Sequence, residues 1–495
     1  MKNPQPFSTW SNAPEHPHVH LNSLCGSVWR VPPGRLRIVR FFLALVLACL
    51  ATTPVCKAAL SLQTIYEFKS SPPRFPQAGL VQADDGNFYG TTVGDGMNGD
   101  FGTVYRITPG GVLTVLHSFR SSDGELPVAG LVQGKDGQLY GTAQGGGAHG
   151  DFGTIFRIST NGEFAVLLSF SGPDGRYPQA ALSLGTNGDF YGTTAFGGTN
   201  ADNGTVFKIT PSGELTSLYS FGGIDGSRPI SSTLPASDGT IYGATLEGGR
   251  DWDGVDLFGD GTLFQITPDG TLTTLVSFED CNGSFPAAGL VLGNDGNFYG
   301  TTQFGGTNDN GYGTVYQLAP DGTLTSLYSF TGLDSKYPQA PLVQARDGSF
   351  FGTAAQGLTT KGTVFQVTTN GEFTTIFSFN GTNGALPLAG LVQGNDGGFY
   401  GTTYEGGAAN AGTVFRLIEL SDAPSITGVT AINGIVTLSW TSVAERIYRV
   451  EHAANLAAPN WIALVPDVIA TGNTSTVTNN VEGETQRYYR IRVLP

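Results

Sequence analysis

The sequence predicts an all-β fold made of a tandem repeat, and three recurring signatures carry this prediction. The tripeptide Tyr-Gly-Thr, or a close variant of it, occurs seven times. Gly-Thr-Val-Phe and its variants also occur seven times, as does an aromatic residue that closes a short alternating segment. The first positions of the three series are Tyr89, Thr103 and Phe68, and the last are Tyr400, Thr413 and Phe379. Repeats are the first feature to establish in a chain, because they decide the whole architecture.

Two of the three spacings between these signatures are constant. The closing aromatic precedes the next Tyr-Gly-Thr by the same interval in every repeat, and the Thr of Gly-Thr-Val precedes the next closing aromatic by another fixed interval. Only the interval from Tyr-Gly-Thr to Gly-Thr-Val varies, and it is longest from Tyr242 to Thr262 and shortest from Phe351 to Thr363. Packing constrains strands and tight turns but tolerates insertions in surface loops. We therefore expect one loop of variable length in each repeat.

Each repeat is predicted to hold four short strands. In the second repeat they cover residues 131–133, 138–143, 154–159 and 163–170. Asp136-Gly137 separates the first two strands and Asn161-Gly162 separates the last two. Such dipeptides are hairpin signals, because the turns require positive φ. Four antiparallel strands per repeat are typical of a β-propeller, with a solenoid as the alternative.

The two ends of the repeat array favour closure into a ring. Residues 60–68 match a fourth strand only, whereas the array stops after a third strand at residues 413–417. Pairing the two segments completes the last blade and removes exposed sheet edges. The sequence thus predicts a seven-bladed β-propeller with four-stranded blades over residues 60–420, with the N-terminal strand closing the last blade.

A different pattern follows the repeats. Residues 425–495 lack the signatures and alternate apolar and polar positions, with Leu438 and Trp440 in one segment and Tyr448 and Val450 in the next. Short alternating strands with a buried Trp near the start predict a small C-terminal β-sandwich that resembles a fibronectin type III module.

The N-terminal segment, residues 1–59, is predicted to be a signal peptide preceded by a disordered leader. Arg35, Arg37 and Arg40 precede the apolar run 41–50, and small residues fill most of 51–59. Basic, apolar and small segments in this order form a secretory signal, with cleavage expected near Ala58 or Ala59. A lipoprotein signal ending at Cys49 is the alternative, and a misplaced start codon would account for the residues before Arg35. We expect a secreted or cell-surface protein.

Charge and cysteine content restrict the possible partners. Of 25 basic and 40 acidic residues, six basic and one acidic lie in 1–59, which leaves 19 basic and 39 acidic residues and a net charge of −20. An acidic chain is unsuited to nucleic acid or to an anionic membrane surface. The apolar run is too short to span a bilayer, so we expect no membrane span in the mature chain. Cys281 is then the one remaining cysteine, which excludes an internal disulfide. We also expect the protein to be a monomer.

The repeat resembles a known family. Residues 130–133 read Gly-Leu-Val-Gln, residues 140–142 read Tyr-Gly-Thr, and residues 153–156 read Gly-Thr-Ile-Phe. These motifs are similar to the gloeo/verruco-type tandem repeat of exported bacterial proteins, which carry assorted C-terminal anchoring modules (the choice-of-anchor type). The resemblance implies export and a surface role. It implies no established activity and no catalytic residues.

The variable loop of the fourth repeat, residues 246–261, is the longest and is the predicted ligand site. The residues expected to bind a ligand such as a sugar are Trp252, Phe258, Asp251, Asp253 and Asp256. Calcium is an alternative ligand, through the oxygen atoms of Asp251, Asp253, Asp256 and Asp260. The competing interpretation is a solvated acidic loop with Trp252 packed beneath it. We expect no cofactor apart from that calcium.

Other recurrent residues are interpreted as structural. We expect turns between repeats to require Asp123, Asp174 and Asp225. The Tyr of Tyr-Gly-Thr is expected to lie in the core, and His117 is interpreted as a packing residue. No nucleophile, zinc or phosphate motif occurs. The sequence therefore favours an exported, non-catalytic protein that binds a glycan or other polymer, for example a polysaccharide, or a cell-surface protein. Binding is expected on the face that carries the loops of variable length. The alternative is a carbohydrate-active hydrolase or lyase with its site at the propeller channel mouth, where acids from different blades could meet.

Overall fold

The computed structural model describes residues 60–94, 99–250, 252, 259–308, 311–357, 360–419, 424, 426–432, 435–442, 446–453, 461–472, 474–480 and 487–494. Apart from the single 3-10 turn Asp280–Asn282, all regular structure in these ranges is strand, which confirms the all-β prediction. Within the same ranges no helix has the length and apolar character that a membrane crossing needs. The predicted signal peptide and leader, 1–59, lie outside the described residues.

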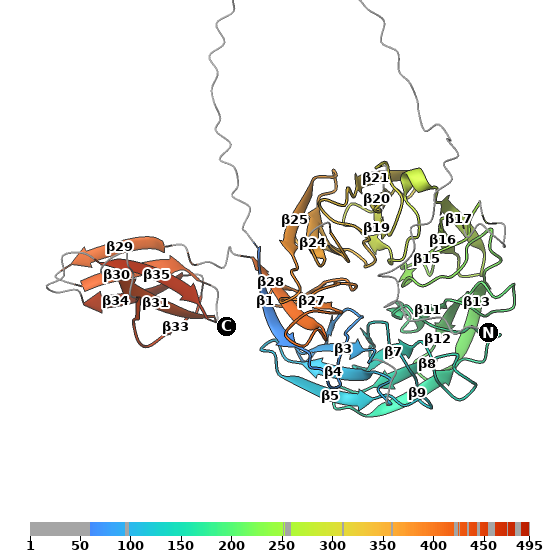
Figure 1. Cartoon of the computed structure of the whole chain (residues 1–495), viewed down its shortest axis with the longest axis horizontal. Helices are drawn as coiled ribbons and strands as arrows, with labels where there is room; N and C mark the ends of the chain where they lie inside the picture. The colour runs from blue at the N-terminus through green and yellow to red at the C-terminus, as the bar shows by residue number, and fades with distance from the viewer. Residues whose placement is uncertain are drawn as a thin grey trace, which may run out of the picture. The chain divides into compact units, whose positions relative to one another are not determined.

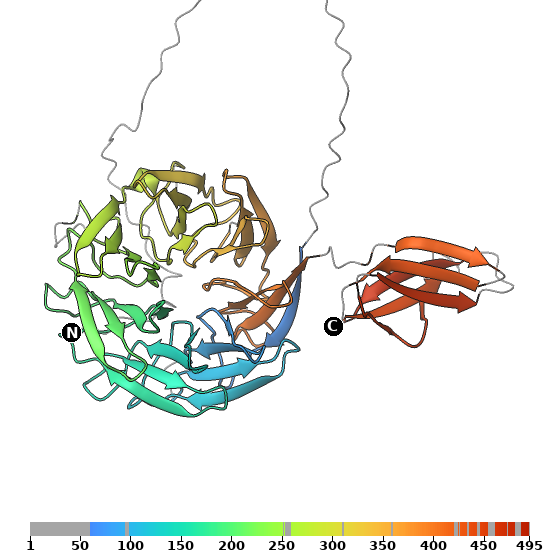
Figure 2. The same cartoon turned by 180° about the vertical axis from the view of Figure 1, so that it is seen from behind.

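Seven four-stranded antiparallel sheets occupy the described part of residues 60–419. We number the repeats by these sheets, and neighbouring sheets lie side by side in chain order (Figures 1 and 2). The first two repeats contain β2 Val81–Gln82, β3 Phe88–Thr92, β4 Thr103–Ile107 and β5 Leu113–Ser118, then β6 Val132–Gln133, β7 Leu139–Ala143, β8 Thr154–Ile158 and β9 Phe164–Ser169. The third and fourth contain β10 Ser183–Leu184, β11 Phe190–Thr194, β12 Thr205–Ile209 and β13 Leu215–Ser220, then β14 Leu234–Pro235, β15 Ile241–Thr245, β16 Thr262–Ile266 and β17 Leu272–Ser277.

The remaining repeats follow the same plan. The fifth and sixth contain β18 Val291–Leu292, β19 Phe298–Thr302, β20 Thr314–Leu318 and β21 Leu324–Ser329, then β22 Val343–Gln344, β23 Phe350–Ala354, β24 Thr363–Val367 and β25 Phe373–Ser378. The seventh contains β26 Val392–Gln393, β27 Phe399–Thr403, β28 Thr413–Glu419 and β1 Leu60–Glu67. The predicted repetition of four-stranded antiparallel sheets is confirmed.

The N-terminal strand supplies the fourth strand of the last sheet. β1 pairs antiparallel with β28, from Leu60 opposite Glu419 to Glu67 opposite Thr413, and the two strands lie together in Figure 1. This is the pairing that the ends of the array predict. The pairing includes a bulge, as the third and fourth strands of the other repeats do, for example between Ile155 and Phe156.

The same bonds that join consecutive repeats also join the last repeat to the first. The hydroxyl of Thr142 donates to the carbonyl of Ala180 in the next repeat at 3.1 Å, and Thr402 donates to Ala78 at 2.9 Å. Aromatic contacts follow the same rule: the ring centroids of Tyr140 and Phe190 are 4.2 Å apart, and those of Tyr400 and Phe88 are 4.1 Å apart. Closure into a seven-bladed propeller stays a prediction, but these contacts are the ones that it requires.

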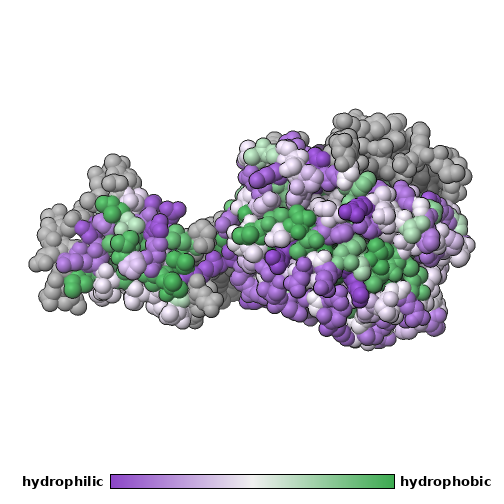
Figure 3. All heavy atoms as spheres, turned by 90° about the horizontal axis from the view of Figure 1, so that it is seen from below, coloured by the Kyte–Doolittle hydropathy of each residue, from purple (hydrophilic) through white to green (hydrophobic). Residues whose placement is uncertain are grey.

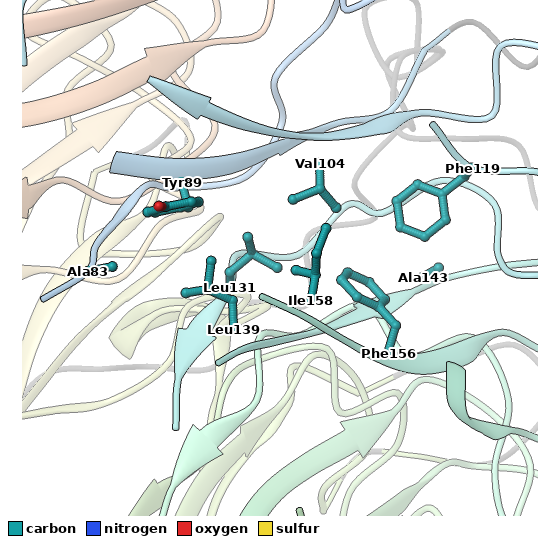
Figure 4. Packing of buried hydrophobic residues seen from close by; sticks show 9 residues of the cluster. All are labelled: Ala83, Tyr89, Val104, Phe119, Leu131, Leu139, Ala143, Phe156 and Ile158. Carbon is teal, nitrogen blue, oxygen red and sulfur yellow. The ribbon is translucent and has the colours of Figure 1, made fainter. Parts of the chain in front are cut away.

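The core lies between neighbouring sheets. Figure 4 shows one cluster, to which the first repeat contributes Tyr89, Val104 and Phe119 and the second contributes Leu139 and Phe156, all of them buried. Tyr89 and Tyr140 are fully buried, so the interpretation of the Tyr-Gly-Thr tyrosine as a core residue is confirmed. Burial between sheets explains the constant spacings, because each aromatic must meet its partner in the next repeat.

The C-terminal segment forms two further antiparallel sheets. One contains β29 Ile426–Ile432, β30 Ile435–Thr441 and β34 Thr474–Asn480, and the other joins β31 Ile447–Ala453 to β32 Ile462–Ala463, β33 Val468–Ile469 and β35 Tyr488–Val493. Leu438 and Trp440 of the first sheet and Tyr448 and Val450 of the second share one buried cluster. The fibronectin type III likeness and the predicted domain limits, 1–59, 60–420 and 425–495, stay predictions.

Surface hydropathy is mixed on the side shown in Figure 3, where hydrophobic patches lie among hydrophilic residues. On the outer strands, Val115 of β5 and Val166 of β9 are 39% and 37% exposed. Single exposed aliphatic side chains of this kind are ordinary on soluble proteins.

Candidate functional site

The connections of each sheet lie at two opposite ends. Tight turns join the first strand to the second and the third to the fourth, and we call their end the tight-turn face. The loops between the second and third strands share the other end with the linkers between sheets, and we call it the variable-loop face. Backbone bonds join these two kinds of segment, as where Glu125 of a linker and Gly145 of a loop exchange bonds of 2.8 and 3.0 Å.

Each linker carries a residue with positive φ immediately before a proline. The φ values lie between 52° and 61° at Phe75, Leu126, Tyr177, Arg228, Phe285, Tyr337 and Leu386. A residue other than glycine adopts this conformation at a cost of about 1–2 kcal/mol, so other contacts must hold it. Tyr337 shows how: its N–H donates to the Tyr312 carbonyl at 3.0 Å, and its own carbonyl accepts the Ala355 N–H at 3.2 Å. The backbone of this position is fixed between the loops of two repeats.

Half-buried aromatic side chains at and beside this position form a cluster over the fourth to sixth repeats, which we call the aromatic cluster. The Phe304 ring centroid lies 5.7 Å from that of Phe285 and 5.1 Å from that of Tyr337, and Tyr312 lies 6.1 Å from Tyr337. The Lys336 ammonium lies 5.6 and 5.4 Å from the Tyr312 and Tyr337 rings, within cation–π range. Burial, together with the nearby Tyr312, raises the pKa of Tyr337 above its ordinary value.

A second group of the same kind lies over the second to fourth repeats. The guanidinium groups of Arg176 and Arg228 lie 5.4 and 5.5 Å from the Phe196 ring. Each is also ion-paired, Arg176 with Asp202 and Arg228 with Glu247. Burial raises the pKa of Glu247, and Arg228 opposes that rise. The carboxylates of this group are therefore committed to arginine partners.

The predicted site in the loop 246–261 lies on this same face. Asp251, Asp253, Asp256 and Phe258 lie outside the described residues. Trp252 is half-buried, and its ring lies against Gly223 of the preceding linker so closely that a Cβ on Gly223 would be 2.4 Å from two ring atoms. The carbonyl of Asp260 accepts the Phe285 N–H at 2.9 Å. The contact with Gly223 supports the packed interpretation of Trp252, whereas the role of the loop in ligand binding stays a prediction.

Trp252 occupies a place that other repeats fill from their own loop. Phe152 lies against Gly172 and Tyr312 lies against Gly332, which correspond to Gly223. In the third repeat the residue that corresponds to Phe152 and Tyr312 is Asn203. Asn203 therefore offers Gly223 no aromatic neighbour from the loop of the third repeat. Trp252, from the long loop of the fourth repeat, lies over Gly223 instead.

The calcium hypothesis involves mostly residues outside the described ranges. Among the described side chains, no group of three or more His, Cys, Asp or Glu could hold a metal ion. Asp260 is the one described member of the four predicted ligands. Calcium binding stays a prediction.

The residues interpreted as structural have the expected local partners. Asp123, Asp174 and Asp225 each accept the backbone N–H of the residue three positions earlier, at 2.7 to 2.8 Å. His117 stacks on Phe164 with ring centroids 3.7 Å apart, and burial lowers its pKa while Asp123 opposes that effect. A turn role for the aspartates and a packing role for His117 account for both.

Sequence reasoning missed the aromatic cluster. The signal was the residue before the linker proline, which is Phe or Tyr in four of the seven repeats. Its meaning depends on Phe304, which comes from a different segment of the chain and meets Phe285 and Tyr337 only in the folded protein.

Comparison with known proteins places the repeats in a family. The Gloeobacter/Verrucomicrobia repeat matches residues 54–255 and 253–434, and no curated protein matches the chain. The extracellular domain of a putative hybrid two-component system from B. thetaiotaomicron aligns with a TM-score of 0.47 at 11% identity, over 88% of this chain and 55% of that one. A gluconolactonase from Xanthomonas campestris aligns with a TM-score of 0.38 at 13% identity, over 70% of this chain and 98% of that one.

Neither solved structure bears on function at these scores, and the chain spans about half the length of the first one. The repeat match has a different weight, because its two segments together cover well over half of the chain and include all of the four-stranded repeat sheets. The chain belongs to the Gloeobacter/Verrucomicrobia repeat family.

Proposed function

We propose that this chain is an exported, non-catalytic, seven-bladed β-propeller, closed by its N-terminal strand, that binds a polysaccharide through the variable-loop face. The observation that carries the proposal is the aromatic cluster of Phe285, Phe304, Tyr312 and Tyr337, each of which is a partly exposed residue. Partly exposed aromatic rings grouped on one face are typical of a binding surface.

The chemistry of the cluster suits a sugar chain. Aromatic rings offer flat apolar faces to the C–H faces of sugar rings, and the tyrosine hydroxyls and the Lys336 ammonium offer hydrogen bonds at the edges. Backbone bonds on both sides of Tyr337 hold its main chain, and contacts with Phe304 and Tyr312 restrict its ring before a ligand arrives. Such preorganisation lowers the entropic cost of binding.

Closure of the ring supports a rigid face. The hydrogen bond from Thr402 to Ala78 and the contact of Tyr400 with Phe88 repeat between the last and first sheets what consecutive sheets show. The turn residue Asn395 also donates its N–H to Gln82 at 2.8 Å, as Asp84 does to Gln133 at 3.1 Å. A closed propeller would hold loops from distant repeats in constant register.

Export rests on the leader and on the family. The basic, apolar and small segments of residues 35–59 form a secretory signal pattern, and the resemblance to exported repeat proteins agrees with it. We assign the C-terminal sheets to a fibronectin type III-like module at the cell surface, in a protein of the choice-of-anchor type. A cell-surface protein would be the alternative partner to a polysaccharide.

A binding role is favoured over the hydrolase or lyase alternative by three acids on this face that are paired with arginine. Asp100 is ion-paired with Arg74 at 2.8 Å, and Asp202 and Glu247 are paired with Arg176 and Arg228. A general acid and a general base need carboxyl groups that can exchange protons with a substrate. Carboxylates held by arginine are unsuited to that task.

A polysaccharide panel tests the proposal. Affinity electrophoresis of the secreted chain should identify a retarding polymer, and Phe304→Ala and Tyr337→Ala should each weaken its binding about 3- to 10-fold, which corresponds to roughly 0.5–1.5 kcal/mol per aromatic contact. Leu386→Ala, at the position in the seventh repeat that corresponds to Tyr337, is the matched control and should bind as the parent does. Unchanged binding by both aromatic variants would refute the site, and release of reducing ends from the polymer would favour the enzyme.

A further inference from the structure

The tight-turn face carries a polar arrangement that recurs from repeat to repeat. The Tyr of Tyr-Gly-Thr donates its hydroxyl to the turn aspartate four residues earlier. The distances are 2.7 Å for Tyr89 to Asp85, 2.7 Å for Tyr140 to Asp136, 2.6 Å for Tyr299 to Asp295 and 2.6 Å for Tyr400 to Asp396. Each of these carboxylates therefore has a donor from its own repeat.

In the seventh repeat a cation from the third strand joins the same carboxylate. Arg416, which lies opposite Tyr400 in register, contacts Asp396 at 2.7 Å. In the third repeat the turn position is Asn187, and the Lys208 ammonium lies 3.7 Å from Asp189, two residues further along the chain. In the seventh repeat the chain itself thus places a guanidinium group beside the turn acid.

The sixth repeat has lost both partners. Phe351 replaces the tyrosine, so no hydroxyl reaches the turn acid Asp347 from that position. Gln366 lies opposite Phe351 in register and replaces the cation. This is the one repeat whose Tyr-Gly-Thr signature begins with Phe instead of Tyr.

A pocket of about 270 Å³ lies where those partners are missing. It lies between the tight turns of the fifth and sixth repeats, at the end of the sheets opposite to the aromatic cluster. Its lining includes Asp295, Gln344, Asp347, Ser349, Gln366 and Thr368. This volume lies slightly below the usual range for ligand sites, so it suits a molecule no larger than one sugar unit.

The base of the pocket contains an acceptor without a partner. Gln366 is 2% exposed, and its Nε2 donates to the Ser349 hydroxyl oxygen at 2.6 Å. The Ser349 hydroxyl in turn donates to Asp347 at 2.5 Å, so that its oxygen can only accept from Gln366. This order fixes the orientation of the amide, and Gln366 Oε1 has no hydrogen-bond partner among the described residues. A buried acceptor in that state is unfavourable.

Two polar side chains of the lining have partners within the chain, whereas the Asn294 amide and the Thr369 hydroxyl have none among the described residues. Gln344 donates to the Gly348 carbonyl at 3.1 Å and accepts the Asn294 N–H at 3.0 Å. Thr368 donates to Asn370 at 2.5 Å and accepts the Glu372 N–H at 3.0 Å. The charged capacity that remains is that of the Asp347 and Asp295 carboxylates, beside the neutral donors of Asn294 and Thr369. Gln366 Oε1 itself exposes less than 1 Å² of surface.

We propose that this pocket binds a small molecule through a primary ammonium group. An ammonium group has three donors and no acceptor, and its charge complements the two carboxylates. It would take the place beside Asp347 that Arg416 takes beside Asp396 in the seventh repeat. The site is independent of polysaccharide binding at the variable-loop face.

Glucosamine and glucose are the test ligands, because they differ by an ammonium in place of a hydroxyl. Titration of the full secreted chain by calorimetry or NMR should show binding of glucosamine and at least tenfold weaker binding of glucose. Phe351→Tyr restores the residue of the other six repeats, so it should fold normally, and its hydroxyl should occupy Asp347 and reduce glucosamine affinity at least tenfold. Asp347→Asn should have a similar effect, and Asp136→Asn, at the same turn position of the second repeat, should have none.

Three results would overturn the proposal. They are equal affinity for glucose and glucosamine, unchanged glucosamine binding by Phe351→Tyr, or no glucosamine binding by the parent chain at tens of millimolar ligand. Displacement of glucosamine by stoichiometric calcium would reassign the acceptors to a metal ion. Phe304→Ala should leave glucosamine affinity unchanged, so failure here and failure of polysaccharide binding are separable.

Discussion

The two ends of the repeat sheets satisfy their polar groups in different ways. At the tight-turn face a recurrent bond joins two side chains of one repeat, as in Tyr89 with Asp85. At the variable-loop face a recurrent pair of bonds joins the backbone of each linker to the loops of neighbouring repeats: Leu126 donates its N–H to Phe101 at 3.0 Å and accepts that of Gln144 at 3.1 Å. A bond between side chains requires particular residues, whereas a bond between backbones leaves the side chain free to vary. The contrast explains why the variable-loop face presents Phe, Leu, Tyr and Arg at one equivalent position.

The largest effect should follow from removal of a constant segment. Deletion of β1, residues 60–67, leaves β28 as an exposed edge and removes the contacts of the first strand with the last sheet. An unpaired edge strand promotes association between chains, so we expect an unfolded or aggregated protein by size-exclusion chromatography and thermal denaturation. A deletion variant that melts as the parent does would show that closure contributes little.

A deletion of similar length in the variable region is the control. Replacing residues 249–258 by a short glycine-containing loop should lower Tm by only a few degrees, because surface-loop length has a weak effect on stability. It should also report on the predicted ligand site at Trp252 and its neighbours. Unfolding of this variant would show that Trp252 is a core residue, and unchanged polysaccharide binding would place the site elsewhere.

An intermediate effect should separate the packing of Trp252 from backbone strain. Gly223 and Gly381 are equivalent linker residues with φ of 104° and 98°, so alanine at either site carries a similar conformational cost of about 1–3 kcal/mol. A Cβ at Gly223 meets the Trp252 ring at 2.4 Å, whereas one at Gly381 is 4.0 Å from Lys361. Gly223→Ala should therefore destabilise the chain by roughly 1 kcal/mol more than Gly381→Ala in denaturant titration. Equal effects would mean that the Trp252 ring moves aside freely.

The smallest effect should have opposite signs for two buried tyrosines. Tyr105 is fully buried, and its hydroxyl has no partner among the described residues; five other repeats have Phe there. Tyr105→Phe removes an unsatisfied hydroxyl and should stabilise the chain by about 1 kcal/mol, whereas Tyr299→Phe removes the 2.6 Å bond to Asp295 and should destabilise it by a similar amount. Chemical denaturation of the two variants measures both, and stabilisation by Tyr299→Phe would contradict a structural role for that bond.

Most of the repeat region could be predicted, because its information is local. Period-two alternation, Asp-Gly and Asn-Gly turns and constant spacings locate four strands per repeat, and the unmatched segments 60–68 and 413–417 predict the pairing of β1 with β28. These features depend on residues within one repeat or on the number of strands, and both are visible in the amino-acid sequence.

The candidate sites depended on which side chains meet across repeats, and only the folded protein decides that. The sequence by itself determined the all-β repeat, its turns, the buried tyrosines and the membership of its family. Tertiary structure placed Phe304 between Phe285 and Tyr337, and it packed Trp252 on Gly223 instead of leaving it as an isolated loop residue. It also left Gln366 Oε1 without a hydrogen-bond partner among the described residues. The reason is physical: strand and turn formation follow from neighbours along the chain, whereas lateral packing depends on the path of each loop and on the stacking of whole sheets.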